Sequence, residues 1–114
     1  MFTDDGAFIV RIPGRPLQEI RGRAELDERF GKLPARGGSL PMTHNLVISI
    51  EGDTAIAYSS IEIRMIENGQ SMIASGYYED SLRRVKDEWK FVVRDNTSYH
   101  LVPHLKGWAA AETK

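Results

Sequence analysis

The spacing of apolar residues changes along the chain, and each spacing predicts a different element. Residues 7–12 form a short apolar run that ends at Pro13-Gly14, which predicts a brief strand followed by a loop. In residues 22–33 the apolar side chains recur at the spacing of one face of a helix, at Leu26, Phe30 and Leu33. The proline and the glycine pair that follow predict the end of this helix.

The chain from residue 44 onward favours β-structure almost throughout. Apolar and β-branched residues form four runs there, separated by short turn signals. The four predicted strands are residues 44–51, 54–66, 71–85 and 89–101. Asn68-Gly69 is the strongest turn signal, because both positions accept a positive φ; the other turns are predicted at Gly52-Asp53 and at residues 86–88. This order predicts an α+β domain with a curved antiparallel sheet that one main helix covers only in part.

Composition narrows the classes of protein that fit this pattern. A chain of 114 residues, with 41% hydrophobic and 27% charged residues, has the size and balance of one folded domain. Its formal net charge of -1 argues against a nucleic-acid partner. The absence of cysteine excludes disulfides, thiolate catalysis and cysteine-ligated zinc. The first residues include two acids where a signal peptide is basic, and no apolar stretch is long enough to span a bilayer, so we expect a cytoplasmic protein without a membrane partner.

Five short segments stand out in order along the chain. They are Phe2-Thr-Asp-Asp-Gly6, Gly22-Arg-Ala-Glu-Leu26 with Phe30, Glu51-Gly-Asp-Thr-Ala55 at the end of the strand from Asn45, Gly76-Tyr-Tyr-Glu-Asp80, and Trp89-Lys-Phe-Val-Val-Arg94. Together they resemble the SnoaL-like branch of the nuclear transport factor 2-like superfamily over about residues 2–97. The resemblance implies a cone-shaped, strongly curved sheet wrapped around a pocket. It places the domain in residues 1–102 and a C-terminal tail in residues 103–114.

Two features depart from the family pattern. The segment that begins here at Phe2 normally follows two helices, which usually close the pocket and in several enzymes carry a catalytic Asp or Tyr. We therefore expect the pocket to be open or closed by something else, and the resemblance assigns that catalytic place to no residue. Relatives also often have a His four residues before the Asn of the next strand, and this chain has Pro41 there, ahead of Asn45.

The main candidate site residues lie on the third and fourth of the predicted meander strands. Alternation puts Tyr78, Asp80 and Leu82 on one face, which we expect to be the interior. Within a regular strand Arg94 faces away from Trp89, and we expect Asp80 and Arg94 to meet across adjacent strands at the floor of the pocket. If the pair is structural, removal of either charge destabilises the fold; if it is functional, Asp80→Asn abolishes ligand binding or turnover.

Other polar and aromatic residues complete the candidate set. The resemblance implies that Arg94 contacts an anionic or carbonyl group of a ligand. His44 is a possible acid-base partner. We place Asn45 on the pocket lining, together with Tyr58 or Ser59 and with Val47 or Ile48. His100 and His104 are expected at the surface, and no metal site or cofactor is predicted. Trp89 is expected in the interior against Phe30 and Leu26, where its removal costs about 3 to 5 kcal/mol.

Three function classes remain open at this point. The first is a small-molecule-binding domain whose apolar pocket holds a hydrophobic ligand with one polar group. The second is a cofactor-independent dehydratase, isomerase or cyclase acting on an oxygenated ring or a polyketide-like substrate, with Asp80 and either Tyr78 or His44 in acid-base catalysis. The third is a dimerisation module that uses outward-facing residues such as Tyr77, Ile56 and Ile61. A homodimer built on the outer face of the sheet is predicted in any case.

Overall fold

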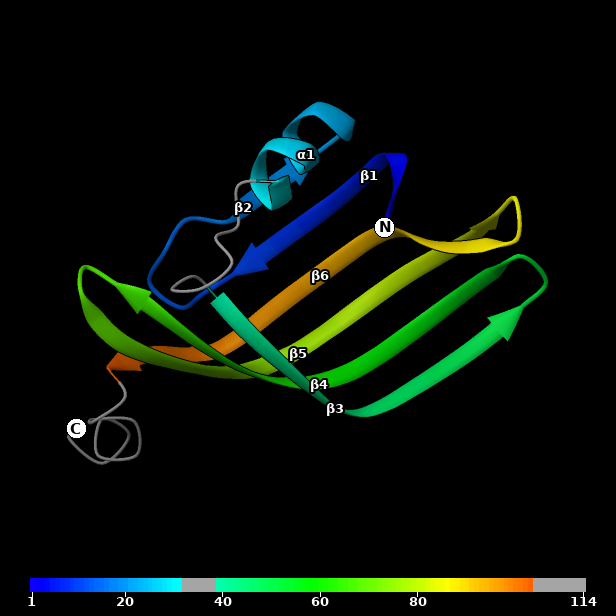
Figure 1. Cartoon of the computed structure of the whole chain (residues 1–114). Coiled ribbons are helices and arrows are strands. Elements are labelled where there is room, and N and C mark those ends of the chain that lie inside the picture. Colours follow the sequence, from blue (N-terminus) through cyan, green and yellow to red (C-terminus); the bar gives the residue numbers. More distant parts are fainter. Residues whose placement is uncertain (32–38, 104–114) are drawn as a thin grey trace.

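The computed structural model describes residues 1–31 and 39–103, and these residues form one helix and a six-stranded curved sheet (Figure 1). The elements are β1 (Phe2–Arg11), β2 (Gln18–Arg21), α1 (Arg23–Gly31), β3 (Ser39–Glu51), β4 (Thr54–Glu67), β5 (Gln70–Val85) and β6 (Glu88–Pro103). The α+β class is therefore confirmed. The predicted tail beyond Pro103, including His104, and residues 32–38, where the helix was predicted to end, lie outside the described residues.

The strand order in the sheet is β2-β1-β6-β5-β4-β3. Strands β3 to β6 form the predicted antiparallel meander, but β1 pairs with β6 in parallel, so the sheet is not antiparallel throughout. β2, which pairs with β1, was also missed, because its four residues are mostly polar and carry no alternation. The sheet is not closed, and β2 and β3 form its two edges.

The predicted hairpin turns are confirmed. Asn68 and Gly69 have φ values of 54° and 74°, and Lys86 and Asp87 have values of 51° and 65°. Two-residue turns with positive φ at both positions match the right-handed twist of the strands that they join. These turns fix the register of β4 against β5 and of β5 against β6.

Register shifts bend the long strands. β6 carries one extra residue opposite the Ser81–Leu82 step of β5 and another opposite the Ser75–Gly76 step, and β3 carries one between His44 and Val47. Such bulges increase local twist and curvature. The bend is strong enough that Arg15, after β1, forms a two-pronged ion pair with Glu67 of β4 at 2.8 Å, although β6 and β5 separate β1 from β4 in the sheet.

The hydrophobic core lies where α1 packs on the concave face of the sheet, which we call the inner face. The rings of Phe2 and Phe8 lie 5.6 and 5.3 Å from that of Phe30, and Phe91 lies 5.5 Å from Phe2. Leu26 of α1 is 3% exposed and belongs to the same cluster. The amphipathic spacing of α1 was therefore read correctly at Leu26 and Phe30.

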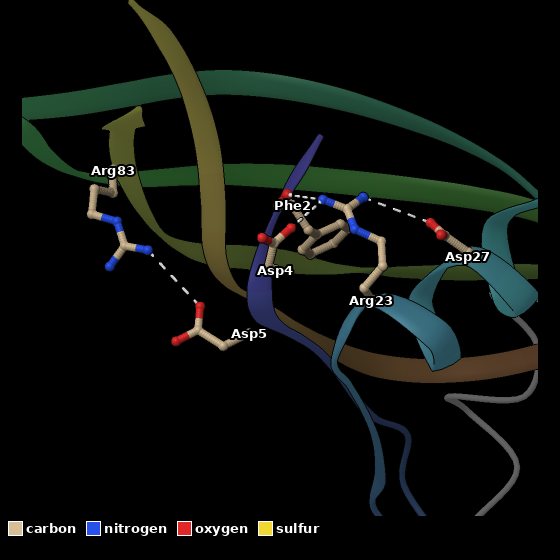
Figure 2. A network of polar contacts seen from close by, with 6 residues as sticks. All are labelled: Phe2, Asp4, Asp5, Arg23, Asp27 and Arg83. Atoms are coloured by element: carbon tan, nitrogen blue, oxygen red, sulfur yellow. Dashed lines mark hydrogen bonds and ion pairs between the residues drawn. The ribbon is translucent and has the colours of Figure 1, made fainter. Parts of the chain in front are cut away.

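Surface ion pairs connect the start of β1 to α1 and to β5 (Figure 2). Arg23, at the first turn of α1, donates to Asp4 at 2.8 Å and to the carbonyl of Phe2 at 3.5 Å, and its guanidinium lies 3.7 Å from Asp27. The hydrogen bond from Arg23 lowers the pKa of Asp4 below its ordinary value. Solvent exposure weakens each of these contacts, so each contributes little to the free energy of unfolding.

The close approach of β5 and β6 at Gly76 generates a stability prediction. A methyl group on Gly76 would overlap the backbone carbonyl oxygen of Thr97, which cannot move without shifting β6. We expect Gly76→Ala to destabilise the protein by about 3 kcal/mol in urea unfolding. Gly69→Ala is the control, because Gly69 has a φ of 74° but free space around it, and should cost only about 1 kcal/mol. Equal losses in the two variants would contradict the close approach.

Candidate functional site

A cavity of about 350 Å³ opens on the inner face, between the β3–β4 hairpin and the β5–β6 hairpin. Most of the side chains around it are apolar, and its polar ones are a threonine, a serine, an aspartate and an arginine. They are Thr43, Leu46, Ile48, Ile50, Ala55, Ala57, Ser59, Asp80, Leu82, Trp89, Phe91 and Arg94. Leu46, Ile48 and Ile50 on the edge strand β3 are more than half exposed. The cavity therefore has an apolar rim and a small polar floor.

The polar floor is the pair Asp80 and Arg94. The two residues are register partners on β5 and β6, and Arg94 Nε lies 3.5 Å from Asp80 Oδ1. This confirms the predicted meeting of the two side chains across adjacent strands. Asp80 is 4% exposed, yet neither Oδ1 nor the Nε of Arg94 has a hydrogen-bond partner within the described part of the chain. The pair is therefore a loose ion pair with unused hydrogen-bonding capacity.

A bulge at Val92 determines which face of the sheet the Arg94 side chain lies on. Leu82 pairs with Phe91, but Ser81 pairs with Val93, so Val92 is the extra residue of β6. In a regular strand Trp89 and Phe91 would face away from Arg94, as the sequence predicted. The bulge turns all three side chains to the inner face, and that prediction was wrong.

Trp89 does not occupy the core position that the sequence predicted. Its side chain is 38% exposed on the cavity rim, and the guanidinium of Arg84 lies 5.5 Å from its ring. Phe91 packs against the core instead, through its contact with Phe2. A loss of 3 to 5 kcal/mol on removal applies to a buried ring, so it is not expected for Trp89.

Two aromatic rings hold the guanidinium of Arg94. Its central carbon lies 3.5 Å from the ring centroid of Tyr78 and 4.6 Å from that of Phe91. Stacking on aromatic faces stabilises a weakly hydrated guanidinium and fixes its plane. Tyr78 is 5% exposed, and burial raises the pKa of its phenol. Tyr78 therefore contributes its ring to the arrangement of Arg94.

Burial decides the charge state of Asp80. It raises the pKa of this carboxyl from 3.8 to about 6, against the opposing effect of the Arg94 charge and with a small addition from Asp95. A carboxyl with this pKa exchanges its proton near neutral pH, which is the range in which a general base or acid works. The loose geometry of the ion pair is consistent with a partner that does not fully compensate for burial.

Among the remaining predicted polar and aromatic site residues, Ser59 lines the cavity; it is 1% exposed and pairs with Tyr78. Tyr58 lies on the opposite, outer face, 43% exposed and stacked 5.5 Å from Tyr77. His44 pairs with the outward-facing Ser60, and Asn45 sits exposed in the β3 bulge with a φ of 53°. His44, Asn45 and Tyr58 are not among the residues that line the cavity.

Alternation along β3 and β4 also decides on which face Val47, Ile48 and Ile61 lie. Ile48 rather than Val47 lines the cavity, and Ile61 is a core residue at 2% exposure, so its predicted place on the outer face was wrong. Leu46 and Ile50 on the rim were missed, although strict alternation from Ile48 would have found both. The bulge between His44 and Val47 explains instead why Thr43, three residues before Leu46, also lines the cavity.

The described residues hold no group of three or more His, Asp and Glu side chains placed to bind a metal ion. None of the helical segments in residues 1–31 and 39–103 is both long and apolar enough to cross a membrane.

Comparison with known proteins gives a consistent picture. A family model described as SnoaL-like domain matches residues 1–95. A search of curated protein sequences gave no match. Among solved structures, a Mycobacterium tuberculosis protein of unknown function aligns with 29% identity and a TM-score of 0.66, over 85% of this chain but only 58% of its own.

Two further solved structures show likeness of fold. A putative scytalone dehydratase from Novosphingobium aromaticivorans aligns with 18% identity and a TM-score of 0.69, over 90% of this chain and 69% of its own. A hexachlorocyclohexane dehydrochlorinase from Novosphingobium barchaimii gives 18% identity and a TM-score of 0.69, over 90% and 71%.

The raised pKa of Asp80 predicts the sign of a pH effect on stability. Between about pH 4 and pH 6 the folded chain keeps a proton that the unfolded chain has lost, so the free energy of unfolding falls as the pH rises through this window. A shift of about two pKa units corresponds to about 3 kcal/mol. Asp80→Asn removes this titration, so its stability relative to the parent protein should rise by about 3 kcal/mol from pH 4 to pH 7 in urea unfolding.

Glu79→Gln is the matched control for this prediction, because Glu79 is the next residue on β5 and is exposed on the outer face. Its stability relative to the parent should show no rise of that size. A difference between Asp80→Asn and the parent that is constant with pH, or that falls as the pH rises, would show that burial does not govern Asp80.

Proposed function

The chain belongs to the SnoaL-like domain family, and we propose that it binds a hydrophobic small molecule whose one polar group contacts Asp80 and Arg94. One observation carries this proposal: a buried ion pair with unused hydrogen-bonding capacity forms the floor of an otherwise apolar cavity. Buried polar groups that lack partners are costly to a fold, so a ligand that satisfies them gains affinity.

The chemistry of the floor indicates the polar group of the ligand. Asp80 as a carboxylate accepts hydrogen bonds only, and the guanidinium of Arg94 donates only. A hydroxyl that donates to Asp80, or a carbonyl that accepts from Arg94, fits these two groups without bringing a net charge into the cavity. Ser59 adds a hydroxyl beside them. His44, Asn45 and Tyr58 lie away from the cavity lining and have no role in this proposal.

A pair of simple probes tests the binding proposal. We expect 2-naphthol to shift the amide NMR signals of residues around Asp80 and Arg94, and naphthalene, which lacks the hydroxyl, to bind more weakly. Asp80→Asn should weaken 2-naphthol binding about tenfold, because a hydrogen bond to a charged group contributes about 1.5 to 3 kcal/mol. Glu79→Gln is the control and should leave binding unchanged. Equal affinity in the parent and in Asp80→Asn would refute the role of this floor.

A second candidate function is supported by the pKa of Asp80, which burial raises to about 6. Two proteins of the same fold are named for eliminations, a dehydratase and a dehydrochlorinase. In an elimination here, Asp80 would take a proton from a carbon atom, the electrons of that C–H bond would form a double bond, and the leaving group would depart from the neighbouring carbon. Arg94 would stabilise negative charge on a leaving group or on a carbonyl oxygen.

Chloride release from hexachlorocyclohexane is the assay for this second function. If Asp80 acts as the base, the rate should rise with pH through about 6 and then level off, because only the carboxylate accepts the proton. Asp80→Asn should lose at least 100-fold in rate. Binding of 2-naphthol without chloride release would support the binding function alone, whereas release that survives Asp80→Asn would exclude Asp80 as the base.

We also propose that the protein is a homodimer formed through the outer face. The rings of Tyr58, Tyr77 and Tyr99 lie in a row there, 5.5 and 5.8 Å apart, and Val47 and Ile56 beside them are 62% and 68% exposed. Apolar surface of this kind is typical of an interface, and an isologous contact uses the same patch on both copies.

Sedimentation equilibrium tests the dimer. The expected mass at micromolar concentration is twice 12.9 kDa. Ile56→Lys should return the mass of one chain, because a charge in the interface would be desolvated. Glu25→Gln, at an exposed position of α1 away from the outer face, is the control and should keep the mass of two chains. A mass of one chain for the parent protein would contradict the proposal.

A further inference from the structure

The two edges of the sheet are protected unequally against pairing with another chain. β2, at one edge, has four residues and carries Glu19 and Arg21, which form an ion pair at 2.9 Å (Figure 1). The first half of β3, at the other edge, contains Pro41 and the bulge with Asn45, where φ is 53°. Charged side chains, proline and bulges all hinder the addition of a strand to an edge. Residues 46–50, which follow Asn45, contain neither a charged residue nor a proline.

Residues 46–50 present apolar side chains on both faces of this edge. Leu46, Ile48 and Ile50 lie on the inner face at the rim of the cavity and are 62%, 52% and 64% exposed. Val47, which points to the outer face, is 62% exposed. The described residues supply no strand beyond β3. An exposed, uncharged run of this kind, with unpaired backbone groups, is the type of edge to which another strand adds.

We propose that residues 46–50 pair with the same segment of a second copy, antiparallel and across a two-fold axis at Ile48. In this register Leu46 lies opposite the partner's Ile50, and the two Ile48 side chains face each other. Residues directly opposite each other in an antiparallel pair lie on the same face, so every pair on the inner face is apolar. On the outer face Val47 lies opposite the partner's Ser49. An isologous contact of this kind is closed, because each copy uses the same segment.

The charges of β3 favour this register. Glu51 is the one acidic residue of β3, and the strand contains no lysine or arginine. Pairing about Ile48 places Glu51 opposite the partner's Asn45, so no like charges meet. A centre one residue later would place Glu51 opposite the partner's Val47. A centre one residue earlier would place His44 opposite an isoleucine and bring the bulge into the contact.

The pairing would extend the inner face of each copy. The partner's Leu46, Ile48 and Ile50 would stand beside the rim of the cavity, so each copy would lengthen the apolar wall of the other. This inference goes beyond the proposed function, because it involves no ligand and neither Asp80 nor Arg94. It uses the edge of the sheet and not the outer-face patch, so both contacts can form. Five residues per copy make a small contact, which forms only at high protein concentration.

Sedimentation equilibrium over a range of concentrations tests the pairing. With a dissociation constant on the order of 100 µM, the weight-average mass should rise about 1.5-fold between about 10 µM and about 500 µM. Ile48→Lys should abolish this rise, because two like charges would meet at the two-fold axis. Ile66→Lys is the matched control, because Ile66 is 56% exposed but lies on β4, which is not an edge strand. Its rise should equal that of the parent protein.

Hydrogen exchange locates the contact without any change in β3. The amides of residues 46–50 that point away from β4 should exchange about threefold more slowly at about 500 µM than at about 10 µM, because paired amides exchange only after dissociation. The amides of β2 are the control and should not change. The mass at the low end reports on the outer-face dimer, and only the rise reports on this pairing.

Three results would overturn the proposal. The first is a mass that stays constant over this range of concentrations. The second is an equal rise in Ile48→Lys and Ile66→Lys. The third is a rise in mass that leaves the exchange of residues 46–50 unchanged, because the copies would then associate through another surface.

Discussion

The register shifts between β5 and β6 are the constraint on which the rest of this structure depends. The bulge at Val92 puts Trp89, Phe91 and Arg94 together on the inner face. The bulge at Tyr99 puts both Ser98 and Leu101 on that face, although the two residues are three positions apart. Without the first bulge, Phe91 would leave the core and the cavity would lose its Trp89 rim. The two bulges also bend the sheet far enough for Arg15 to reach Glu67 across it.

Burial on the inner face is favourable for one group of side chains and unfavourable for another. The phenylalanine cluster under α1 stabilises the fold by removing large rings from water. Asp80 on the same face resists burial, which raises its pKa to about 6, and Arg94 stands close without a hydrogen bond to its Oδ1. Carboxyl groups with a perturbed pKa are common at binding and catalytic sites. The apolar cavity around the pair is the reason why we propose that the pair forms the polar end of a binding site.

Much of the fold could be predicted from the sequence, because local chemistry determines it. Asn68-Gly69 adopts the positive φ values that its residue types allow, and alternation correctly placed Tyr78 and Asp80 on the inner face. The positions of Trp89 and Arg94 could not be predicted together, because a bulge changes the period of two and Val92 carries no local signal for one. The four polar residues of β2 and the parallel pairing of β1 with β6 depend on contacts distant in sequence.

The most direct test of the central claim, that burial outweighs Arg94 in setting the charge of Asp80, is a titration of the Asp80 carboxyl carbon by ¹³C NMR in labelled protein. A midpoint near pH 6 is the predicted result, with a higher midpoint in Arg94→Met, because that variant removes the charge that lowers the pKa. A midpoint at or below 3.8, the ordinary value of the group, would contradict the claim and make the pair a structural ion pair.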